Sequence, residues 1–199
     1  MNSKKILAAV YSMEVAGGKS RVKELAERLG LSQKEARDEI EKLSKLGLVR
    51  AGEKGARLTP RGRRAIKVVF IGGGFEVIHY GHLYTIEKAR ALGDALVVSV
   101  ARDSTIRRRK SREPLVGEKD RTKLLSALRF VDAAILGVEG DIYVALERAN
   151  PDVVALGYDQ YHMEDEIRAE ADRRGMKLKV VRLDSPYPGI KTSKLLKDF

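Results

Sequence analysis

The chain has 199 residues, 43% hydrophobic and 34% charged, a balance typical of a globular protein with one large domain or two small ones. It has no cysteine, which excludes disulfides and thiolate catalysis, and no apolar run of about 18 residues, so we expect a cytoplasmic protein without a membrane partner. The net charge is +11, and residues 1–64 carry 16 Lys and Arg against 8 Asp and Glu, so most of the excess basicity lies in the first third.

The first third predicts three helices followed by a hairpin. Apolar residues recur at helical spacing in segments 4–15, 20–29 and 32–46, and each segment ends near glycine. Two short segments, 48–50 and 56–59, are separated by glycine and charged residues and are typical of an antiparallel hairpin. This order resembles a small winged helix-turn-helix domain, which we place at residues 1–65.

A winged helix implies DNA as a possible partner, with the third helix in the major groove and the hairpin on phosphates. The candidate DNA contacts are Lys34, Arg37, Arg50, Lys54 and Arg57. The basic hairpin favours this interpretation, whereas the third helix has as many acidic as basic residues and no net attraction for phosphate. The alternative is a domain used for dimerisation or protein contact, and we also expect a homodimer.

Residues 66–199 predict alternating strands and helices. The expected buried strands are 68–71, 95–101, 131–136, 153–156 and 178–183, and helical periodicity fills most of the intervals. The charge run 107–114 is on its own typical of a solvated face. Alternation of this kind predicts an α/β domain with a Rossmann-like parallel sheet, helices on both faces, and ligands at the carboxyl ends of the strands.

Three glycines, residues 72–74, end the first of these strands, and His79-Tyr80-Gly81-His82 begins the following helix. Glycines let a backbone approach an anion closely, and a helix N-terminus favours negative charge. The dinucleotide fingerprint fails because its third glycine would be Val77. Two imidazoles three residues apart face the same way and can donate to a phosphoryl oxygen.

Two other interpretations of the histidines stay open. His79, His82 and His162 together could form a zinc site, because metal ligands often lie one helical turn apart. The pair could also mark an ordinary helix start at the surface.

The glycine turn with H-x-G-H resembles the nucleotidylyltransferase superfamily, over about the last two-thirds of the chain. The resemblance implies transfer of a nucleoside monophosphate to a phosphate-bearing acceptor with release of pyrophosphate, and Mg²⁺ or another divalent cation as cofactor. It implies a loop at residues 107–114 and catalytic roles for His79, His82 and Lys110. It also implies nucleotide contacts at Gly73, Gly74, Phe75, His79, His82, Gly157, Asp159, Gln160, Thr192 and Ser193, and acceptor or phosphate contacts at Glu76, Arg121, Arg129 and Lys191.

Within the superfamily, segments 92–94, 100–105 and 157–160 look most like the archaeal FAD synthases, which adenylylate FMN. Segment 189–192 is closer to the glycerol-3-phosphate cytidylyltransferases. The resemblance therefore leaves ATP or CTP as nucleotide, and FMN or a small phosphorylated alcohol as acceptor. A function of another class is a winged-helix transcriptional regulator whose second domain senses a nucleotide.

Overall fold

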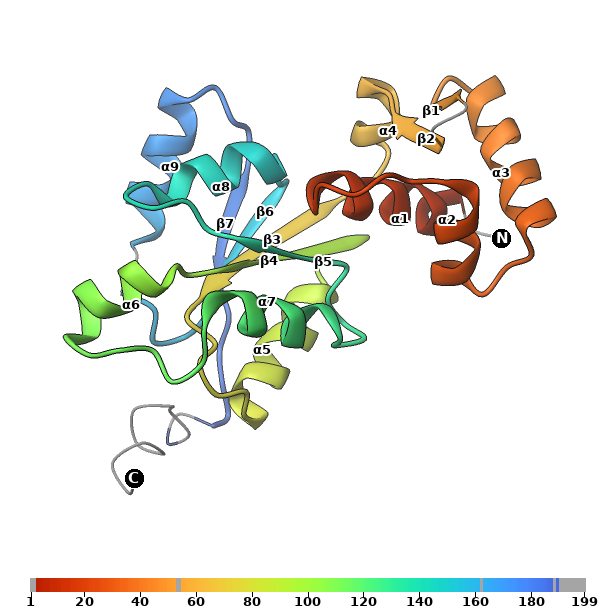
Figure 1. The fold of residues 1–199 in the computed structure, drawn as a ribbon. Coiled ribbons are helices and arrows are strands. Elements are labelled where there is room, and N and C mark those ends of the chain that lie inside the picture. The colour runs from red at the N-terminus through yellow and green to blue at the C-terminus, as the bar shows by residue number, and fades with distance from the viewer. Residues whose placement is uncertain (1–2, 53–54, 162, 188, 190–199) are drawn as a thin grey trace. The chain divides into compact units, whose positions relative to one another are not determined.

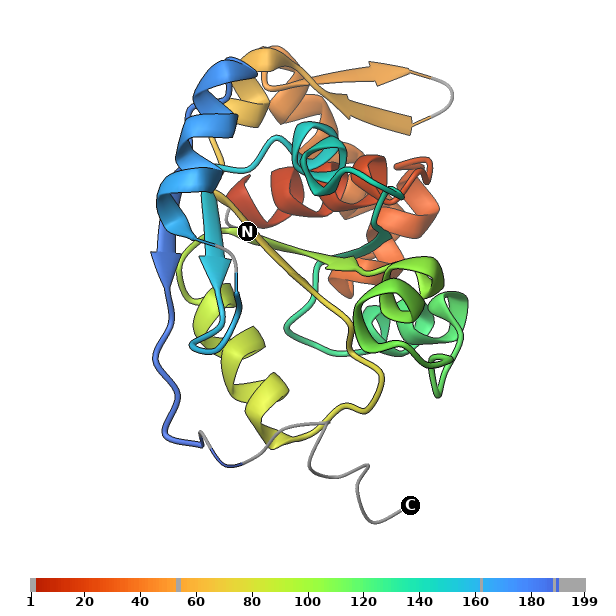
Figure 2. The same ribbon diagram turned by 90° about the vertical axis from the view of Figure 1, so that its left-hand side faces the viewer.

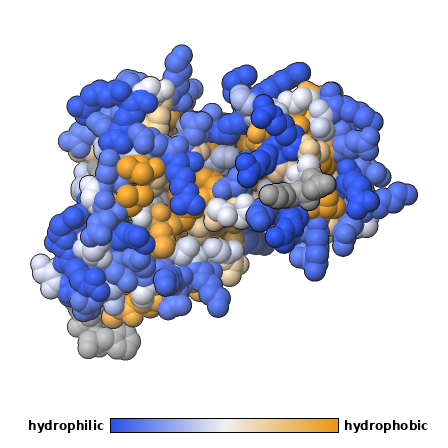
Figure 3. All heavy atoms as spheres, turned by 45° about the horizontal axis from the view of Figure 1, so that its top comes forward, coloured by the Kyte–Doolittle hydropathy of each residue, from blue (hydrophilic) through white to orange (hydrophobic). Residues whose placement is uncertain are grey.

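The chain divides into two compact units, Met1–Lys67 and Val68–Phe199, two residues beyond the predicted boundary. A computed structural model of the protein describes residues 3–52, 55–161, 163–187 and 189. Hydrophilic residues cover most of the face seen in Figure 3. Within the described ranges, no helix combines the length and apolar character needed to cross a membrane.

The first unit is three helices, a two-stranded antiparallel hairpin and a short closing helix (Figures 1 and 2). Its elements are α1 (Ser3–Val15), α2 (Val22–Leu29), α3 (Gln33–Lys45), β1 (Val49–Gly52), β2 (Gly55–Leu58) and α4 (Pro60–Arg64). The capping box at the start of α3 is present, because Ser32 accepts from the Glu35 N–H and the Glu35 carboxylate accepts from the Ser32 N–H. Helix α4 was not predicted. The winged-helix assignment stays a prediction.

The second unit is a five-stranded parallel sheet with helices on both faces. Its elements are β3 (Val68–Gly73), α5 (Tyr80–Arg90), β4 (Ala95–Val100), α6 (Asp103–Lys110), α7 (Glu118–Ser126), β5 (Ala133–Leu136), α8 (Ile142–Ala149), β6 (Val153–Leu156), α9 (Glu164–Arg173) and β7 (Lys179–Arg182). The strand order β5-β4-β3-β6-β7 confirms the predicted Rossmann-like α/β sheet. The order reverses between β3 and β6, which makes their carboxyl ends the expected ligand crevice.

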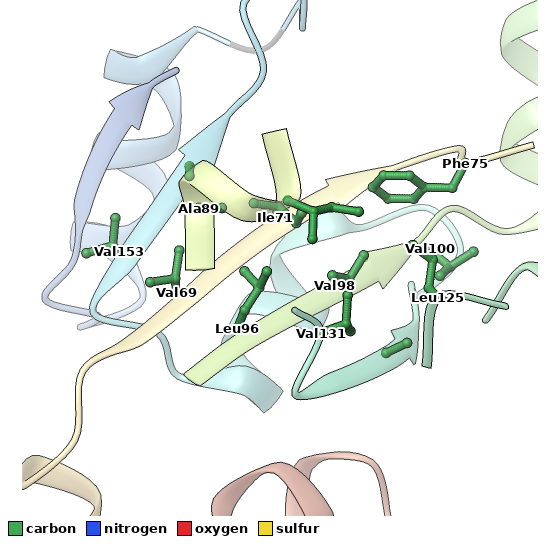
Figure 4. Close-up of a cluster of buried hydrophobic side chains, with 13 residues drawn as sticks. Val69, Ile71, Phe75, Ala89, Leu96, Val98, Val100, Leu125, Val131 and Val153 are labelled. Atoms are coloured by element: carbon green, nitrogen blue, oxygen red, sulfur yellow. The ribbon is translucent and has the colours of Figure 1, made fainter. Parts of the chain in front are cut away.

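Strands β3 and β4 are apolar on both faces, which buries them at the centre of the sheet. On one face, Val69 and Val98 belong to a core cluster that also contains Ile86 and Ala89 of α5 and Leu125 of α7 (Figure 4). Helices α8 and α9 lie on the opposite face of the sheet from α5 and α7 (Figure 1).

Helix α6 corrects the predicted loop over residues 107–110, whereas residues 111–114 lie outside any helix, as predicted. Its last turn is the basic run 107–110, where cations are favourable at the carbonyl end of the helix dipole. Ser111, with a left-handed φ of 51°, ends the helix and turns the chain back toward the sheet.

Candidate active site

The turn between β3 and α5 requires a close approach of the Gly73 backbone to the Phe75 ring. A Cβ on Gly73 would lie 2.9 Å from the ring of Phe75, closer than real Cβ atoms come, so glycine is needed there. Phe75 itself has a φ of 50°, in the left-handed region that non-glycine residues seldom occupy. Its buried ring packs against the His82 ring with centroids 5.3 Å apart. The turn therefore fixes the position of the two imidazoles at the start of α5.

The two predicted catalytic imidazoles lie together at the start of α5. Their rings stack with centroids 3.9 Å apart and planes 29° apart, and the His79 carbonyl accepts from the His82 N–H at 2.9 Å. Both ring nitrogens of His79 and Nδ1 of His82 are buried, and none of the three has a hydrogen-bond partner among the described residues. Buried polar atoms without partners are rare in folded proteins, so these nitrogens point to a ligand.

Burial lowers the pKa of His79. Burial also lowers the pKa of His82 to about 4, and the neighbouring His79 ring contributes in the same direction. Both imidazoles are therefore neutral near pH 7, each with a single N–H, and a hydrogen bond with the Val77 backbone acts to raise the pKa of His82 against the effect of burial. The Asp159 carboxylate acts in the opposite direction on both pKa values, so the predicted loop residue is close enough to influence the pair.

Glu76, predicted as an acceptor or phosphate contact, is instead a fully buried anchor for two cations. Its carboxylate accepts from Lys110 and, at 2.7 Å, from Arg112, while the Leu115 N–H donates to it at 3.3 Å. Burial would raise the pKa of Glu76, but the hydrogen bonds from Arg112 and Lys110 outweigh it and bring the pKa to about 2. Lys110 and Arg112 keep 41% and 35% of their side chains exposed, so both can still meet an anion.

Arg121 was predicted to contact phosphate, and the structure contradicts this because its side chain is completely buried. Its guanidinium donates to the carbonyls of Gly74 at 2.5 Å, Ala101 at 2.8 Å and Val116 at 2.8 Å, and pairs with Asp103. Arg121 thus ties the glycine turn to the end of β4 and to the loop before α7, and its role is structural.

The predicted phosphate contact at Arg129 is also wrong in its placement. Arg129 precedes β5, whose first residue, Ala133, pairs with Val97 in a parallel register. It therefore lies at the amino end of the sheet, whereas the glycine turn follows the carboxyl end of β3. Its guanidinium covers the ring of Phe130 at 4.5 Å.

The loop after β6 spans the crevice between β3 and β6. The Gln160 amide donates to the Gly72 carbonyl at 2.6 Å, and its oxygen accepts from the Gly157 N–H at 3.1 Å. Arg182 of β7 donates to the carbonyls of Gly157 and Gln160, which fixes the loop from the other side. This places Gly157, Asp159 and Gln160 at the same carboxyl edge as the glycine turn, as the sequence predicted.

Several predicted residues lie outside the described part of the chain, namely His162, Lys191, Thr192, Ser193 and, in the first unit, Lys54. No group of three or more His, Asp or Glu side chains that could hold a metal ion occurs among the residues that the structure describes. Near the turn, the Glu76 carboxylate forms an ion pair with Lys110, and the Asp103 carboxylate forms one with Arg121. Within the described part of the chain, these two carboxylates are therefore not free to bind a metal ion.

A pocket of about 150 Å³ opens at this edge on the face of the sheet that α8 and α9 cover. It shares Gly72 and Gly73 with the glycine turn and is otherwise mostly apolar, with Phe70, Val138 and Tyr161 among its lining residues. Tyr161 is 60% exposed and its ring lies 4.1 Å from the Arg109 guanidinium. Such an open apolar rim beside polar groups is typical of a site for a ligand with an aromatic ring.

Arg112 and the pocket residues Phe70, Val138 and Tyr161 were not predicted as site residues. Arg112 was visible as the next cation after Lys110 in the charge run, and Tyr161 as the aromatic residue directly after Gln160. No local sequence pattern marks Phe70 and Val138 as pocket residues, because they come from β3 and from the segment after β5 and meet only in the folded sheet.

Comparison with known proteins gives the following similarities. A sequence model of the family described as Cytidylyltransferase-like matches residues 70–197. The chain is 39% identical over 137 residues to the FAD synthase of Thermococcus kodakarensis, covering 67% of this chain and 91% of that protein. It is 45% identical over 115 residues to the FAD synthase of Methanohalophilus mahii, covering 58% of this chain and 80% of that protein. A solved structure, the lipopolysaccharide core biosynthesis protein from Thermoplasma volcanium, is 39% identical with a TM-score of 0.58, covering 60% of this chain and 98% of that one.

Proposed function

Because the chain belongs to the cytidylyltransferase-like family of nucleotidyltransferases, we propose that it transfers AMP from ATP to FMN and so forms FAD. A phosphate oxygen of FMN attacks the α-phosphorus of ATP, the new P–O bond forms, and the bond to pyrophosphate breaks. The observation that carries the proposal is the stacked pair of imidazoles, whose buried nitrogens lack partners among the described residues beside the glycine turn.

Catalysis in this arrangement is positioning and charge stabilisation, with no covalent enzyme intermediate. The neutral imidazoles of His79 and His82 donate to the α-phosphoryl oxygens as negative charge builds on them. Lys110, held by Glu76, supplies positive charge at the same turn. A divalent cation bound with ATP would neutralise part of the negative charge of its phosphates.

The apolar pocket supports FMN over a small phosphorylated alcohol as the acceptor. A cavity of about 150 Å³ lined by apolar side chains is large enough for a benzene ring, and this pocket has that volume. The dimethylbenzene edge of the flavin would fill it between Phe70 and Tyr161, whereas glycerol 3-phosphate has no apolar group to place there. The FAD synthase relatives support the same acceptor.

The substrate assignment is tested by incubating the protein with each of ATP, CTP, GTP and UTP and with FMN, glycerol 3-phosphate or phosphopantetheine. Pyrophosphate release and chromatography of the product give the readout. We expect FAD from ATP and FMN. A product from CTP and glycerol 3-phosphate, with none from ATP and FMN, would favour the cytidylyltransferase alternative.

The role of the imidazoles is tested with His79→Asn, His82→Asn and, as the matched control, His162→Asn. The first two changes should lower kcat by roughly 10²-fold to 10³-fold, the scale seen when one donor to a developing charge is lost. The control should keep near-normal turnover. Equal losses in all three variants, restored by zinc, would instead support the three-histidine zinc site.

The acceptor pocket is tested by filling it with Val138→Trp and by placing the same side chain outside it with Val144→Trp. Val138 lines the pocket, whereas Val144 of α8 is 37% exposed and is not among its lining residues. We expect Val138→Trp to raise the KM for FMN about tenfold or more, the scale of about 1.4 kcal/mol of lost binding, and to leave the KM for ATP unchanged. Equal KM values for FMN in both variants would place the flavin elsewhere.

A further inference from the structure

One side of helix α6 borders the apolar pocket of the second unit. Arg102, which is the N-cap residue of α6, Thr105 and Arg109 are three and four residues apart, so they lie on one side of the helix. All three line the pocket. The lining residues from α8 and the segment before it, such as Val138 and Ile142, are apolar. The pocket therefore suits a ring that has one apolar end and one polar end.

The two arginines on this side of α6 differ in how their charge is balanced. Arg102 donates to the Glu118 carboxylate at 2.6 Å. Among the described residues, no carboxylate forms an ion pair with Arg109, whose pKa is lowered by burial and by the like charge of Arg108. A guanidinium nevertheless stays protonated in a protein. Arg109 therefore brings to the pocket a positive charge that no described acidic group neutralises.

An aromatic ring holds this charge in place. The Arg109 guanidinium lies over the Tyr161 ring, with its carbon 4.1 Å from the ring centroid. Both residues line the pocket and both are exposed, so they lie where the pocket opens to solvent. The attraction to the ring face depends on the charge, and the guanidinium keeps N–H groups that can donate hydrogen bonds. The mouth of the pocket thus presents positioned donors to a ligand.

The cations for the phosphate groups lie elsewhere. Lys110 follows Arg109 directly, but it pairs with Glu76 beside the glycine turn, because successive helix residues point about 100° apart. Arg112 pairs with the same carboxylate at 2.7 Å. Positive charge at the turn therefore comes from Lys110 and Arg112, which leaves Arg109 to contact a different part of the ligand.

We propose that Arg109 donates hydrogen bonds to a carbonyl oxygen and the adjacent ring nitrogen at the pyrimidine end of the flavin, and so contributes to the choice of acceptor. The contact rests on the proposed function, which makes FMN the acceptor. With the dimethylbenzene edge inside the apolar pocket, the opposite end of the rigid three-ring system lies at the mouth, beside Arg109. The planar fork of a guanidinium matches two neighbouring acceptors.

The experiment follows flavin fluorescence as the full chain is titrated with FMN and with riboflavin, which has the same ring and no phosphate. The test variant is Arg109→Gln. The control is Arg108→Gln, which removes the same charge from an exposed neighbour that is not among the pocket-lining residues. Arg109→Lys keeps the charge but lacks the planar fork. Each variant is also assayed for FAD formation and thermal melting.

We expect Arg109→Gln to weaken binding of FMN and of riboflavin by the same factor, about tenfold or more, the scale of hydrogen bonds from a charged donor. The KM for FMN should rise in parallel, while the KM for ATP and the melting temperature should stay at wild-type values. Arg109→Lys should recover part of the affinity, and Arg108→Gln should bind both flavins like wild type.

Two results would overturn the contact while leaving FAD formation intact. A loss confined to FMN would assign Arg109 to the phosphate instead of the ring, and equal flavin affinities in Arg109→Gln and Arg108→Gln would show that Arg109 contacts neither. A wild-type protein that forms no FAD from ATP and FMN would instead reject the proposed function, and the contact with it.

Discussion

Replacing Glu76 with Gln removes the negative charge that holds Lys110 and Arg112 beside the glycine turn. The Glu76 side chain is fully buried, and hydrogen bonds from both cations outweigh the effect of burial and lower its pKa to about 2 from an ordinary value near 4.5. A difference of this size corresponds to about 3 kcal/mol of stability at neutral pH. Breaking a buried ion pair from one side costs about 3 to 5 kcal/mol, so the two arguments agree.

The matched control is Glu113→Gln. Glu113 pairs with Arg107 at 2.8 Å in the same part of the chain, but its side chain is 73% exposed, so its loss should cost less than about 1 kcal/mol. Urea unfolding of both variants gives the comparison. Because the folded pKa of Glu76 is depressed, its contribution is fully present above about pH 4.5 and disappears as the pH falls toward 2.

The same substitution should lower turnover, since Lys110 would no longer be held at the turn. Glu76→Asp keeps the negative charge and should therefore recover part of the stability and part of the turnover that Glu76→Gln loses. Equal unfolding free energies for Glu76→Gln and Glu113→Gln at pH 7 would refute the reasoning, because they would mean that burial adds nothing to the ion pair.

Three further predictions concern the same site. Burial and the His79 ring lower the pKa of His82 to about 4, so the folded state binds fewer protons than the unfolded state between pH 6.5 and 4. Acidification across this window should therefore lower the free energy of unfolding by up to about 3 kcal/mol in the wild type and by less in His82→Asn. Unfolding experiments at each pH measure the difference. Gly73→Ala should destabilise the protein by about 1 to 3 kcal/mol and lower kcat, because the new Cβ would lie 2.9 Å from the Phe75 ring. In the control Gly74→Ala, the new Cβ would lie 4.0 Å from its nearest neighbour, so this variant should melt like wild type. Equal melting temperatures for the two variants would contradict this prediction. Arg121→Met should cost about 3 kcal/mol or more in urea unfolding, because it leaves Asp103 and three carbonyls without their donor, and near-wild-type stability would reject the structural role.

The sheet and the histidine pair were predictable because their signals are local. Apolar runs define strands such as β4, and three glycines before His79-Tyr80-Gly81-His82 define a turn into a helix. Helix α6 was missed because its last turn is a run of four basic residues, a composition that is also typical of an exposed loop.

The roles of the arginines could not be predicted from sequence, because they depend on where distant segments meet. Arg121 finds its acceptors at Gly74 and Ala101, 47 and 20 residues earlier in the chain, and only their convergence makes burial of a guanidinium favourable. Arg129 was assigned to the site by motif position, but the parallel direction of β5 places it at the other edge of the sheet. The apolar pocket likewise exists only after β3, α8 and α9 pack together.

The most direct test of the central claim is a crystal structure of the full chain with FMN and an ATP analogue that has a methylene group between the α- and β-phosphorus atoms. We predict that α-phosphate oxygens lie within hydrogen-bond distance of the His79 and His82 ring nitrogens that have no partner among the described residues, and that the flavin edge lies between Phe70 and Tyr161. Phosphates bound away from the glycine turn, or imidazoles that do not contact them, would contradict the account.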